Sequence, residues 1–193
     1  MKLKGSQTAK NLMQSFAGES QARMRYTYYA SQAKKDGYVQ MSDIFTETAE
    51  NEKEHAKRFY KFLVEEMEDE MVEITAEFPV NLQDTKANLK AAAAGEHEET
   101  NLLYPQFAKV AEEEGFIAIA EVFKHIAAAE ARHETRFLKL LENIENGKVF
   151  EKDAEVEWKC GNCGYIQKGK AAPALCPACA HEQKYFEVFK ETY

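Results

Sequence analysis

The amino-acid sequence predicts a mainly α-helical protein, in which a four-helix bundle is followed by a small metal-bound domain with short β-strands. Three observations predict this arrangement. Apolar residues recur at helical spacing through four long segments before residue 150. Glycine and proline, with 9 and 4 copies in 193 residues, are scarce and clustered. All four cysteines lie in a single stretch near the C-terminus.

The four helices follow one another with short, long and short connections. Asp36-Gly37 and Glu114-Gly115 provide glycine stops after the first and third helices. The long connection runs from about Glu68 to Asp84 and contains Pro79. The helices are expected over about Gln7–Asp36, Val39–Glu66, Thr85–Glu114 and Phe116–Asn146. This order is typical of a four-helix bundle with one long crossover.

The composition changes near residue 150. Residues 151–193 contain all the cysteines, the single tryptophan, Trp158, and the strand-like run Tyr185–Phe189. A segment this short cannot rely on its own apolar core, so a metal is expected to hold it together. The sequence therefore predicts two domains, a bundle over residues 1–149 and a cysteine domain over residues 150–193.

The bundle sequence repeats internally. Residues 44–63 resemble residues 122–141 at a constant offset of 78, whereas the offset upstream is 77. The pairs related in this way include Glu19 with Glu96, Glu52 with Glu130, His55 with His133, and Gly37 with Gly115. Two similar helix pairs would pack about an approximate two-fold axis, so any functional residue at their shared seam would occur twice.

Carboxylates and histidines occupy core positions at this seam. Glutamate is rarely buried without a partner, and facing buried carboxylates repel one another unless cations lie between them. Two Glu-x-x-His pairs with glutamates from the other two helices are typical of a carboxylate-bridged dimetal site, and oxygen ligands with two imidazoles favour iron or manganese. The expected ligands are Glu19, Glu52, His55, Glu96, Glu99, Glu130 and His133. The alternative is that these residues are only exposed charges on a glutamate-rich helical protein. That would not explain why the same residues recur at a fixed offset and always at core positions of the helices.

Glu99 breaks the internal symmetry, because it aligns with Ala22 in the first half. Two interpretations stay open. Glu99 lies near the metal that His55 serves, or it is an additional ligand that binds and leaves. Pro105, inside the third helix, is expected to kink it or to leave a carbonyl free one turn earlier.

The cysteines form two Cys-x-x-Cys loops separated by 12 residues. Each loop can offer two thiolates to the same metal. The four thiolates of the two loops would then bind one metal in a tetrahedral site. The ligands are Cys160, Cys163, Cys176 and Cys179. Zinc would make this domain a structural ribbon, and iron would make it a one-electron carrier; the spacing alone accepts both metals.

Charge and hydropathy exclude several functions. With 25 basic and 33 acidic residues the formal charge is −8, which disfavours nucleic-acid binding. No apolar stretch approaches the roughly 20 residues that cross a bilayer, and the first residues do not resemble a secretory signal. A cytoplasmic location is therefore expected, where clustered cysteines indicate a metal site in preference to disulfides.

In this order, the Glu-x-x-His bundle and the Cys-x-x-Cys-Gly-Tyr and Cys-Pro-x-Cys loops resemble the rubrerythrins over essentially the whole chain. The resemblance implies a ferritin-like di-iron bundle and a rubredoxin-like Fe(Cys)4 domain, with three Fe per chain. It implies a peroxidase that reduces hydrogen peroxide to water in oxidative stress protection. The electrons would come from NAD(P)H through a separate reductase or rubredoxin, within a homodimer that transfers electrons between chains.

The resemblance also implies individual roles. Glu52 and Glu130 would bridge the irons, Glu19 would bind one iron, and Glu96 and His133 the other. The first iron would exchange between His55 and Glu99 as its oxidation state changes. Tyr26 and Tyr104 would hydrogen-bond to ligand carboxylates. Ala180 stands where rubredoxins usually have glycine, and left-handed backbone there would cost about 1 kcal/mol.

Two rival functions remain at this point. The same ligands would serve a ferroxidase that uses oxygen to oxidise Fe(II), although an electron-transfer domain would then have no evident purpose. A non-enzymatic metal-binding protein with a zinc ribbon is the other. The remaining histidines are off the ligand phase and are not expected to bind metal: His97, His125 and His181.

Overall fold

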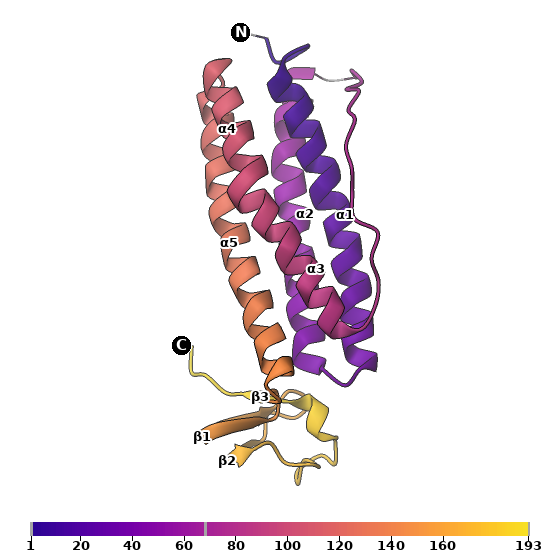
Figure 1. The fold of residues 1–193 in the computed structure, drawn as a ribbon, viewed down its shortest axis with the longest axis vertical. Coiled ribbons are helices and arrows are strands. Elements are labelled where there is room, and N and C mark those ends of the chain that lie inside the picture. The colour runs from indigo at the N-terminus through magenta and orange to yellow at the C-terminus, as the bar shows by residue number, and fades with distance from the viewer. Residues whose placement is uncertain (1, 68, 193) are drawn as a thin grey trace.

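The computed structural model describes residues 2–67 and 69–192, and it has the expected bundle with a small sheet at one end (Figure 1). The long helices end within one or two residues of the expected positions, whereas the expected third helix is divided by a π-helical segment. The helical elements are α1 Gln7–Lys35, α2 Val39–Met67, α3 Thr85–Glu98, the π-helical segment Glu99–Leu103, α4 Tyr104–Glu113 and α5 Ile117–Glu145. Helix α1 packs against α2, and α3 and α4 pack against α5.

Two aromatic layers lie in the bundle core, and the internal repeat relates them. The rings of Phe45 and Phe137 have centroids 5.2 Å apart, and those of Phe59 and Phe123 are 5.0 Å apart. All four residues are fully buried. On α2, Phe45 and Phe59 lie seven residues before and after Glu52. The layers therefore flank the middle of the bundle on both sides and keep water away from it.

The two halves of the bundle cap each other's helices. Glu114, after α4, accepts hydrogen bonds from the Gln7 N–H at 2.9 Å and from the N–H and hydroxyl of Thr8 at 2.8 and 2.6 Å. Asp36, after α1, accepts hydrogen bonds from the N–H and hydroxyl of Thr85 at 2.9 and 2.6 Å. Asp36 and Glu114 are related by the 78-residue offset, so the repeat extends to contacts that close opposite ends of the bundle.

Replacing Glu114 with Gln is expected to lower the free energy of unfolding by about 1 kcal/mol at neutral pH, because a charged acceptor of helix N–H groups is lost. Partial burial favours the protonated form, but the hydrogen bonds from Thr8 and Gln7 outweigh it and hold the pKa of Glu114 below its ordinary value. This stabilisation is therefore present above the ordinary carboxyl pKa and is lost as the pH falls through the lowered value.

Urea unfolding from about pH 3 to about pH 7 measures this effect. Glu113→Gln, at an exposed neighbouring position, is the matched control. A difference between Glu114→Gln and the native protein that does not shrink at low pH contradicts the assignment.

The long crossover after α2 contains no regular secondary structure from Met71 to Gln83 and runs alongside α1 (Figure 1). The Tyr29 hydroxyl, on α1, donates a hydrogen bond to the Asn81 carbonyl at 3.1 Å. Phe78, within the crossover, is 40% exposed. The crossover agrees with the expected connection, of which Glu68 lies outside the described residues.

The cysteine domain is a three-stranded antiparallel sheet in the order β2-β1-β3. Its elements are β1 Glu151–Cys160, β2 Ile166–Ala171, a 3₁₀ turn Gln183–Tyr185 and β3 Phe186–Val188. Trp158 and Phe186 form its core with the cysteines. Ala180 has a left-handed backbone, with φ of 57°, as the comparison with rubredoxins predicted.

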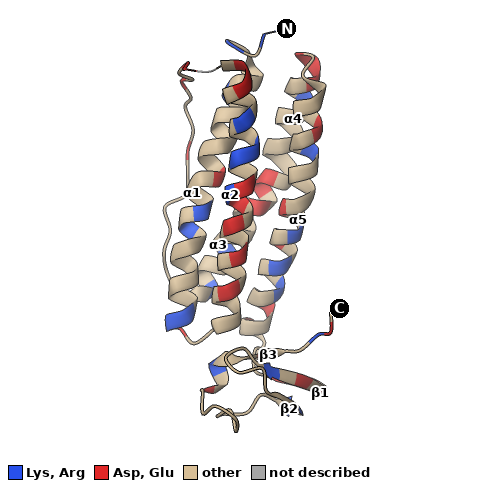
Figure 2. Cartoon of the chain, turned by 180° about the vertical axis from the view of Figure 1, so that it is seen from behind, with Lys and Arg blue, Asp and Glu red and all other residues tan. Residues whose placement is uncertain are grey.

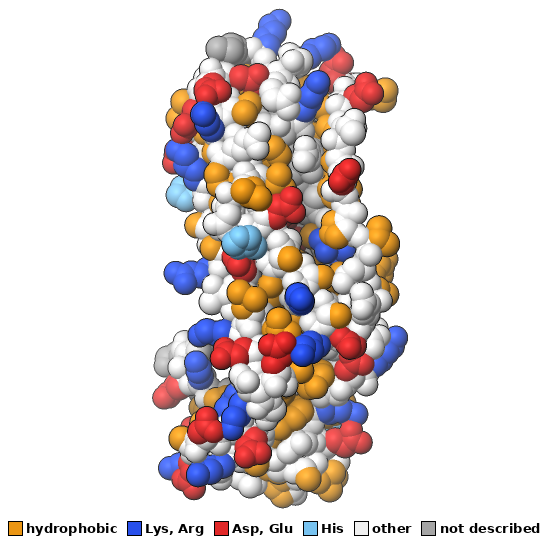
Figure 3. All heavy atoms as spheres, viewed as in Figure 1, with side chains coloured by type: hydrophobic (Ala, Val, Ile, Leu, Met, Phe, Trp, Pro, Cys, Tyr) orange, Lys and Arg blue, Asp and Glu red, His pale blue; other side chains and the backbone are white. Residues whose placement is uncertain are grey.

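The cysteine domain lies at the end of the bundle where α2 begins (Figure 1). The Phe150 ring stacks on Tyr38 at 6.4 Å, and the Gln40 amide donates a hydrogen bond to Glu187 at 3.4 Å. No helix among the described residues is long and apolar enough to cross a membrane. Basic and acidic side chains are interspersed on the face shown in Figure 3.

Candidate metal centres

The predicted bundle ligands meet near the middle of the bundle, where acidic residues lie on neighbouring helices (Figure 2). Their oxygen and nitrogen atoms form two groups of four, and within each group the atoms lie within 4.8 Å of one another. One group is Glu19, Glu52, His55 and Glu130, and the other is Glu52, Glu96, Glu130 and His133. Six of the seven predicted ligands therefore converge, and Glu52 and Glu130, called here the shared carboxylates, belong to both groups.

Each shared carboxylate extends one oxygen toward each histidine. His55 Nδ1 lies 3.0 Å from Glu52 Oε2 and 2.7 Å from Glu130 Oε1. His133 Nδ1 lies 3.2 Å from Glu52 Oε1 and 2.6 Å from Glu130 Oε2. The two oxygens of one carboxylate thus point at two different positions, which is the arrangement a bridging ligand of two metals requires.

Glu19 and Glu96 close the two ends of this cluster, each held by a tyrosine from the opposite half of the repeat. The Tyr104 hydroxyl donates to Glu19 Oε1 at 2.5 Å, and the Tyr26 hydroxyl donates to Glu96 Oε1 at 2.5 Å. Burial and then the nearby carboxylates raise the pKa of both phenols well above the ordinary value. Both tyrosines therefore stay protonated, and their hydrogen bonds orient the carboxylates.

The cluster requires positive charge. Burial, reinforced by neighbouring carboxylates, raises the pKa of Glu19 and Glu96 well above the ordinary carboxyl value. For the histidines burial alone would lower the pKa, but the close approach and negative charge of the shared carboxylates raise the pKa of His55 to about 10 and that of His133 to about 9. Protonation of Glu19, Glu96 and both histidines is thus favoured, whereas for Glu130 the effect of burial is outweighed by the two histidines, which lower its pKa.

Some buried atoms of the cluster make no hydrogen bond of regular geometry, which tests whether metals fit. Among the described residues these atoms face one another across the cluster, and they are Glu19 Oε2, Glu52 Oε1, Glu96 Oε2, both Glu130 oxygens and His133 Nδ1. Buried polar atoms are rarely left in this state. Four carboxylates and two imidazoles that converge on two positions fit two metal ions, and hard oxygen donors with imidazole suit iron.

Glu99 lies beside both groups but belongs to neither. Its pKa is raised by burial and then by the shared carboxylates, so it is close enough to interact with them. The Cβ that an alanine would place at Gly18 would lie 3.9 Å from Glu99 Oε1. The structure therefore supports the expectation that Glu99 lies on the side of the cluster served by Glu19 and His55.

Glu99 also begins the π-helical segment Glu99–Leu103, and the internal repeat explains why. The offset between the halves is 77 at Glu96 and 78 at Tyr104, so the second half contains one extra residue between them. A π-helical turn holds one more residue than an α-helical turn, so the insertion is absorbed without rotating α3 against α4. The sequence contained this signal, and Pro105 is the second residue of α4, which follows the segment.

Deleting Leu102 is expected to convert this segment to regular α-helix, because the deletion removes the extra residue. Leu102 is 62% exposed, so its side chain contributes little to packing. The melting temperature and the helical circular dichroism should stay at the native level, since α3 and α4 keep their register. Deleting Leu138, 46% exposed on α5, is the control and should strongly destabilise the protein, because no insertion exists there to be removed. Equal destabilisation by the two deletions would refute this interpretation.

The four cysteines form the second candidate centre. Their sulfur atoms lie within 4.8 Å of one another, with Cys160 Sγ 3.8 Å from Cys179 Sγ and Cys163 Sγ 3.7 Å from Cys176 Sγ. Cys160 and Cys176 are buried, whereas Cys163 is exposed. This arrangement fits one tetrahedral metal with an edge open to a redox partner.

The three histidines that were not expected to bind metal lie outside both centres. His97 is exposed, and its Nδ1 atom lies 2.9 Å from Glu134 Oε1. His125 is exposed, and His181 Nδ1 lies 3.2 Å from the Cys179 carbonyl. His181 is thus near the cysteine site without belonging to its ligand set.

Comparison with known proteins assigns this combination of centres to a family. A family model described as rubrerythrin matches residues 10–141, and one described as the rubredoxin-like domain of rubrerythrin matches residues 158–187. The chain belongs to the rubrerythrin family. Among its relatives are the rubrerythrins of Clostridium perfringens, 65% identical over 99% of this chain and 98% of that protein, and of Nitratidesulfovibrio vulgaris, 56% identical over 96% of each chain.

Solved structures agree with the fold. Fully reduced nigerythrin is 33% identical, with a TM-score of 0.65 over 96% of this chain and 87% of that chain. A bacterioferritin of Mycobacterium tuberculosis, at 15% identity and a TM-score of 0.65 over 76% of this chain and 90% of that chain, shares the fold alone. Rubrerythrins are di-iron oxidoreductases associated with oxidative stress. The bundle is accordingly a di-iron carboxylate site, and the four cysteines bind one iron.

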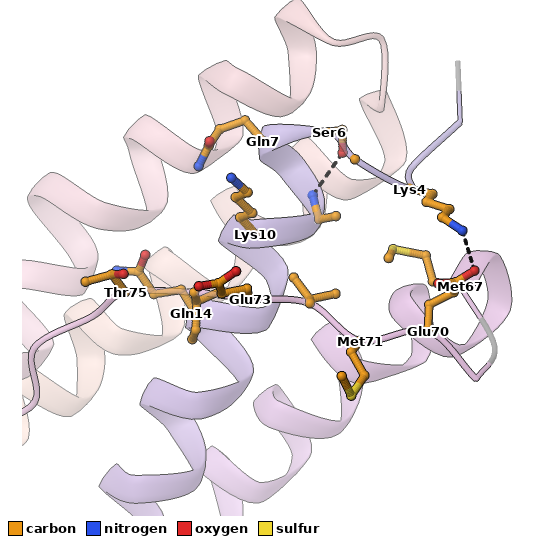
Figure 4. A pocket seen from close by; sticks show the side chains of 14 residues that line it. Lys4, Ser6, Gln7, Lys10, Gln14, Met67, Glu70, Met71, Glu73 and Thr75 are labelled. Carbon is orange, nitrogen blue, oxygen red and sulfur yellow. Dashed lines mark hydrogen bonds and ion pairs between the residues drawn. The ribbon is translucent and has the colours of Figure 1, made fainter.

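A cavity of about 650 Å³ lies away from both centres, where the start of α1 meets the end of α2 and the crossover. Figure 4 shows Lys4 pointing toward Glu70 at this place, and the two form an ion pair. None of the candidate ligands is among the residues that line it. This cavity is therefore not the entrance to the di-iron site.

Proposed function

We propose that this protein is a peroxidase that reduces hydrogen peroxide to two molecules of water, using two electrons and two protons per peroxide. The observation that supports the proposal most directly is the presence of two centres in one chain: a buried cluster suited to two irons, and a four-cysteine site suited to a one-electron carrier. A site that had to store or oxidise iron would not need the second centre.

Glu52 and Glu130 would hold both irons, Glu19 and His55 would complete one position, and Glu96 and His133 the other. Bound there, the irons supply Lewis acidity and two electrons to the O–O bond. The residues around them supply a dry, fixed environment.

Tyr26 and Tyr104 hold the carboxylates of Glu96 and Glu19 in place through hydrogen bonds. Both phenols keep their protons, because their pKa values are raised. Glu99, with its raised pKa, is a carboxyl group near the cluster that can hold a proton or offer an additional ligand.

Electrons would reach the bundle from NAD(P)H through a separate reductase or rubredoxin and then through the cysteine site. Within one chain the path is long. The cysteine domain contacts α2 at Gln40, and the 12 residues from there to Glu52 span about 18 Å along the helix axis. We therefore infer a homodimer in which the cysteine domain of one chain serves the bundle of the other.

Stopped-flow mixing of the fully reduced protein with hydrogen peroxide, and separately with oxygen, tests the proposal. Peroxide is expected to oxidise the di-iron site faster than oxygen by about tenfold or more, a difference of about 1.4 kcal/mol in barrier. A faster reaction with oxygen would favour a ferroxidase.

A further inference from the structure

A second cavity, of about 220 Å³, adjoins the di-iron site on the face formed by α1, the α3–α4 helix and the crossover. Tyr104, which is 1% exposed, lines its buried end, and Phe78 of the crossover, which is 40% exposed, lines its outer end. Glu99 also lines it. The cavity therefore extends from the surface to the side chains that surround the cluster.

The inner end of this cavity is lined by residues that hold or adjoin the candidate iron ligands. Tyr104 donates its hydrogen bond to Glu19, and the lining residues Gly18 and Gly95 directly precede Glu19 and Glu96 in the chain. On the opposite face of the cluster, formed by α2 and α5, the His55 and His133 side chains are 17% and 11% exposed. Their Nδ1 atoms approach the shared carboxylates, so the imidazole rings stand between the carboxylates and solvent there.

Two glycines keep the cavity open, one from each half of the repeat. A Cβ at Gly18 would lie 3.9 Å from Glu99 Oε1 and 3.9 Å from the Phe78 ring, which is ordinary contact, and larger side chains would enter the space between them. A Cβ at Gly95 would meet no atom within 4 Å. Glycine is a poor helix former, so two of them inside α1 and α3 cost stability that an open cavity explains.

The walls do not favour anions. They carry one guanidinium, from Arg25, against the carboxylates of Glu77 and Glu98, together with the Glu99 carboxyl group, whose pKa is raised. This balance repels anions. Arg25 is among the lining residues, and its Nη1 atom is buried without a hydrogen-bond partner among the described residues. The volume admits water-sized molecules, and Phe78 narrows the outer end.

We propose that this cavity is the route by which peroxide reaches the di-iron site, and that Gly18, Gly95 and Phe78 set its width. The inference rests on the proposed peroxidase function for the identity of the substrate. The route itself is tested with a probe that needs no peroxide chemistry.

The probe is nitric oxide, a small neutral molecule that binds ferrous iron, mixed with the fully reduced protein in a stopped-flow spectrometer. Gly18→Leu and Gly95→Leu fill the cavity from opposite walls and should each lower the association rate constant by about tenfold or more. Ala94→Leu, at the exposed position beside Gly95, is the matched control and should leave the rate constant at the native value. Gly18→Ala adds only ordinary van der Waals contacts, so this variant should fold. Its association rate constant for nitric oxide should fall less than that of Gly18→Leu.

Phe78→Ala tests the outer end with peroxides of two sizes. Oxidation of the reduced protein by cumene hydroperoxide should become about tenfold faster, because the side chain that narrows the entrance is removed, whereas the rate with the smaller hydrogen peroxide should rise much less. Iron content and melting temperature are measured for every variant, so that a loss of metal or fold is distinguished from a closed route.

Unchanged nitric oxide association in Gly18→Leu and Gly95→Leu, both folded and iron-loaded, overturns the route. If nitric oxide association falls as expected while the native protein fails to react with any peroxide, the peroxidase function is wrong and the route for small neutral molecules stands. If Phe78→Ala gains no rate with the larger peroxide, Phe78 does not set the width of the entrance.

Discussion

Replacing Glu130 with Ala is expected to remove both irons from the bundle and leave the iron bound by the cysteines. Glu130 Oε1 lies 2.7 Å from His55 Nδ1 and Glu130 Oε2 lies 2.6 Å from His133 Nδ1, so one side chain serves both metal positions. Its loss leaves each position short of a ligand. Iron should fall from about three atoms per chain to about one, and peroxide reduction should fall by about 10³-fold.

Glu134→Ala is the control, because Glu134 lies four residues further along α5 and pairs with His97 outside both groups. Elemental analysis counts the metals, and Mössbauer spectroscopy separates the two iron types. The variant should fold, since the loss of one carboxylate relieves repulsion in the cluster that remains. A Glu130→Ala protein that retains about three irons per chain would contradict the assignment of Glu130 as a shared ligand.

Replacing Cys163 with Ser is expected to separate the two halves of the reaction. The bundle, whose ligands are untouched, should still oxidise once with peroxide at the native rate. Turnover with NAD(P)H and a reductase should be lost, because the site that accepts single electrons has only three thiolates. Coupled turnover at the native level would refute a relay through the cysteine site.

Mixed dimers of Glu130→Ala and Cys163→Ser chains test whether the relay crosses between chains. In such a dimer one chain has an intact cysteine site and the other an intact bundle. Transfer between chains restores coupled turnover, and transfer within a chain does not. The distance of about 18 Å along α2 from Gln40 to Glu52 favours the first outcome. Mixed dimers without activity would show that the electrons stay within one chain.

The helices and the ligands could be predicted from sequence because each depends on local periodicity. Glu52 and His55 are three residues apart on one apolar stripe, so a helix of any length places them on the same face. Glu19 and Glu96 are recognisable because the repeat presents the same residue twice. The cysteine spacing specifies a metal loop in the same way, independent of the rest of the fold.

The π-helical segment could be predicted only in part. The change of offset from 77 to 78 shows that one residue is inserted between Glu96 and Tyr104. It does not show which turn of the helix widens, because that depends on which side chains must stay in register with α1 and α5. The structure places the wide turn at Glu99, the residue without a counterpart in the first half.

Spacing along single elements was enough to predict two domains, four helices, the candidate bundle ligands and the four thiolates. Of the seven candidate ligands, the structure brings six into the two groups, and Glu99 lies beside them. Tertiary structure alone decided which oxygen of Glu52 or Glu130 approaches which histidine, the exchange of caps at Asp36 and Glu114, and the cavity between Gly18 and Phe78. Periodicity tells which face of a helix is buried, but not how far apart two buried faces lie. Those distances arise when all the side chains between the helices pack at once.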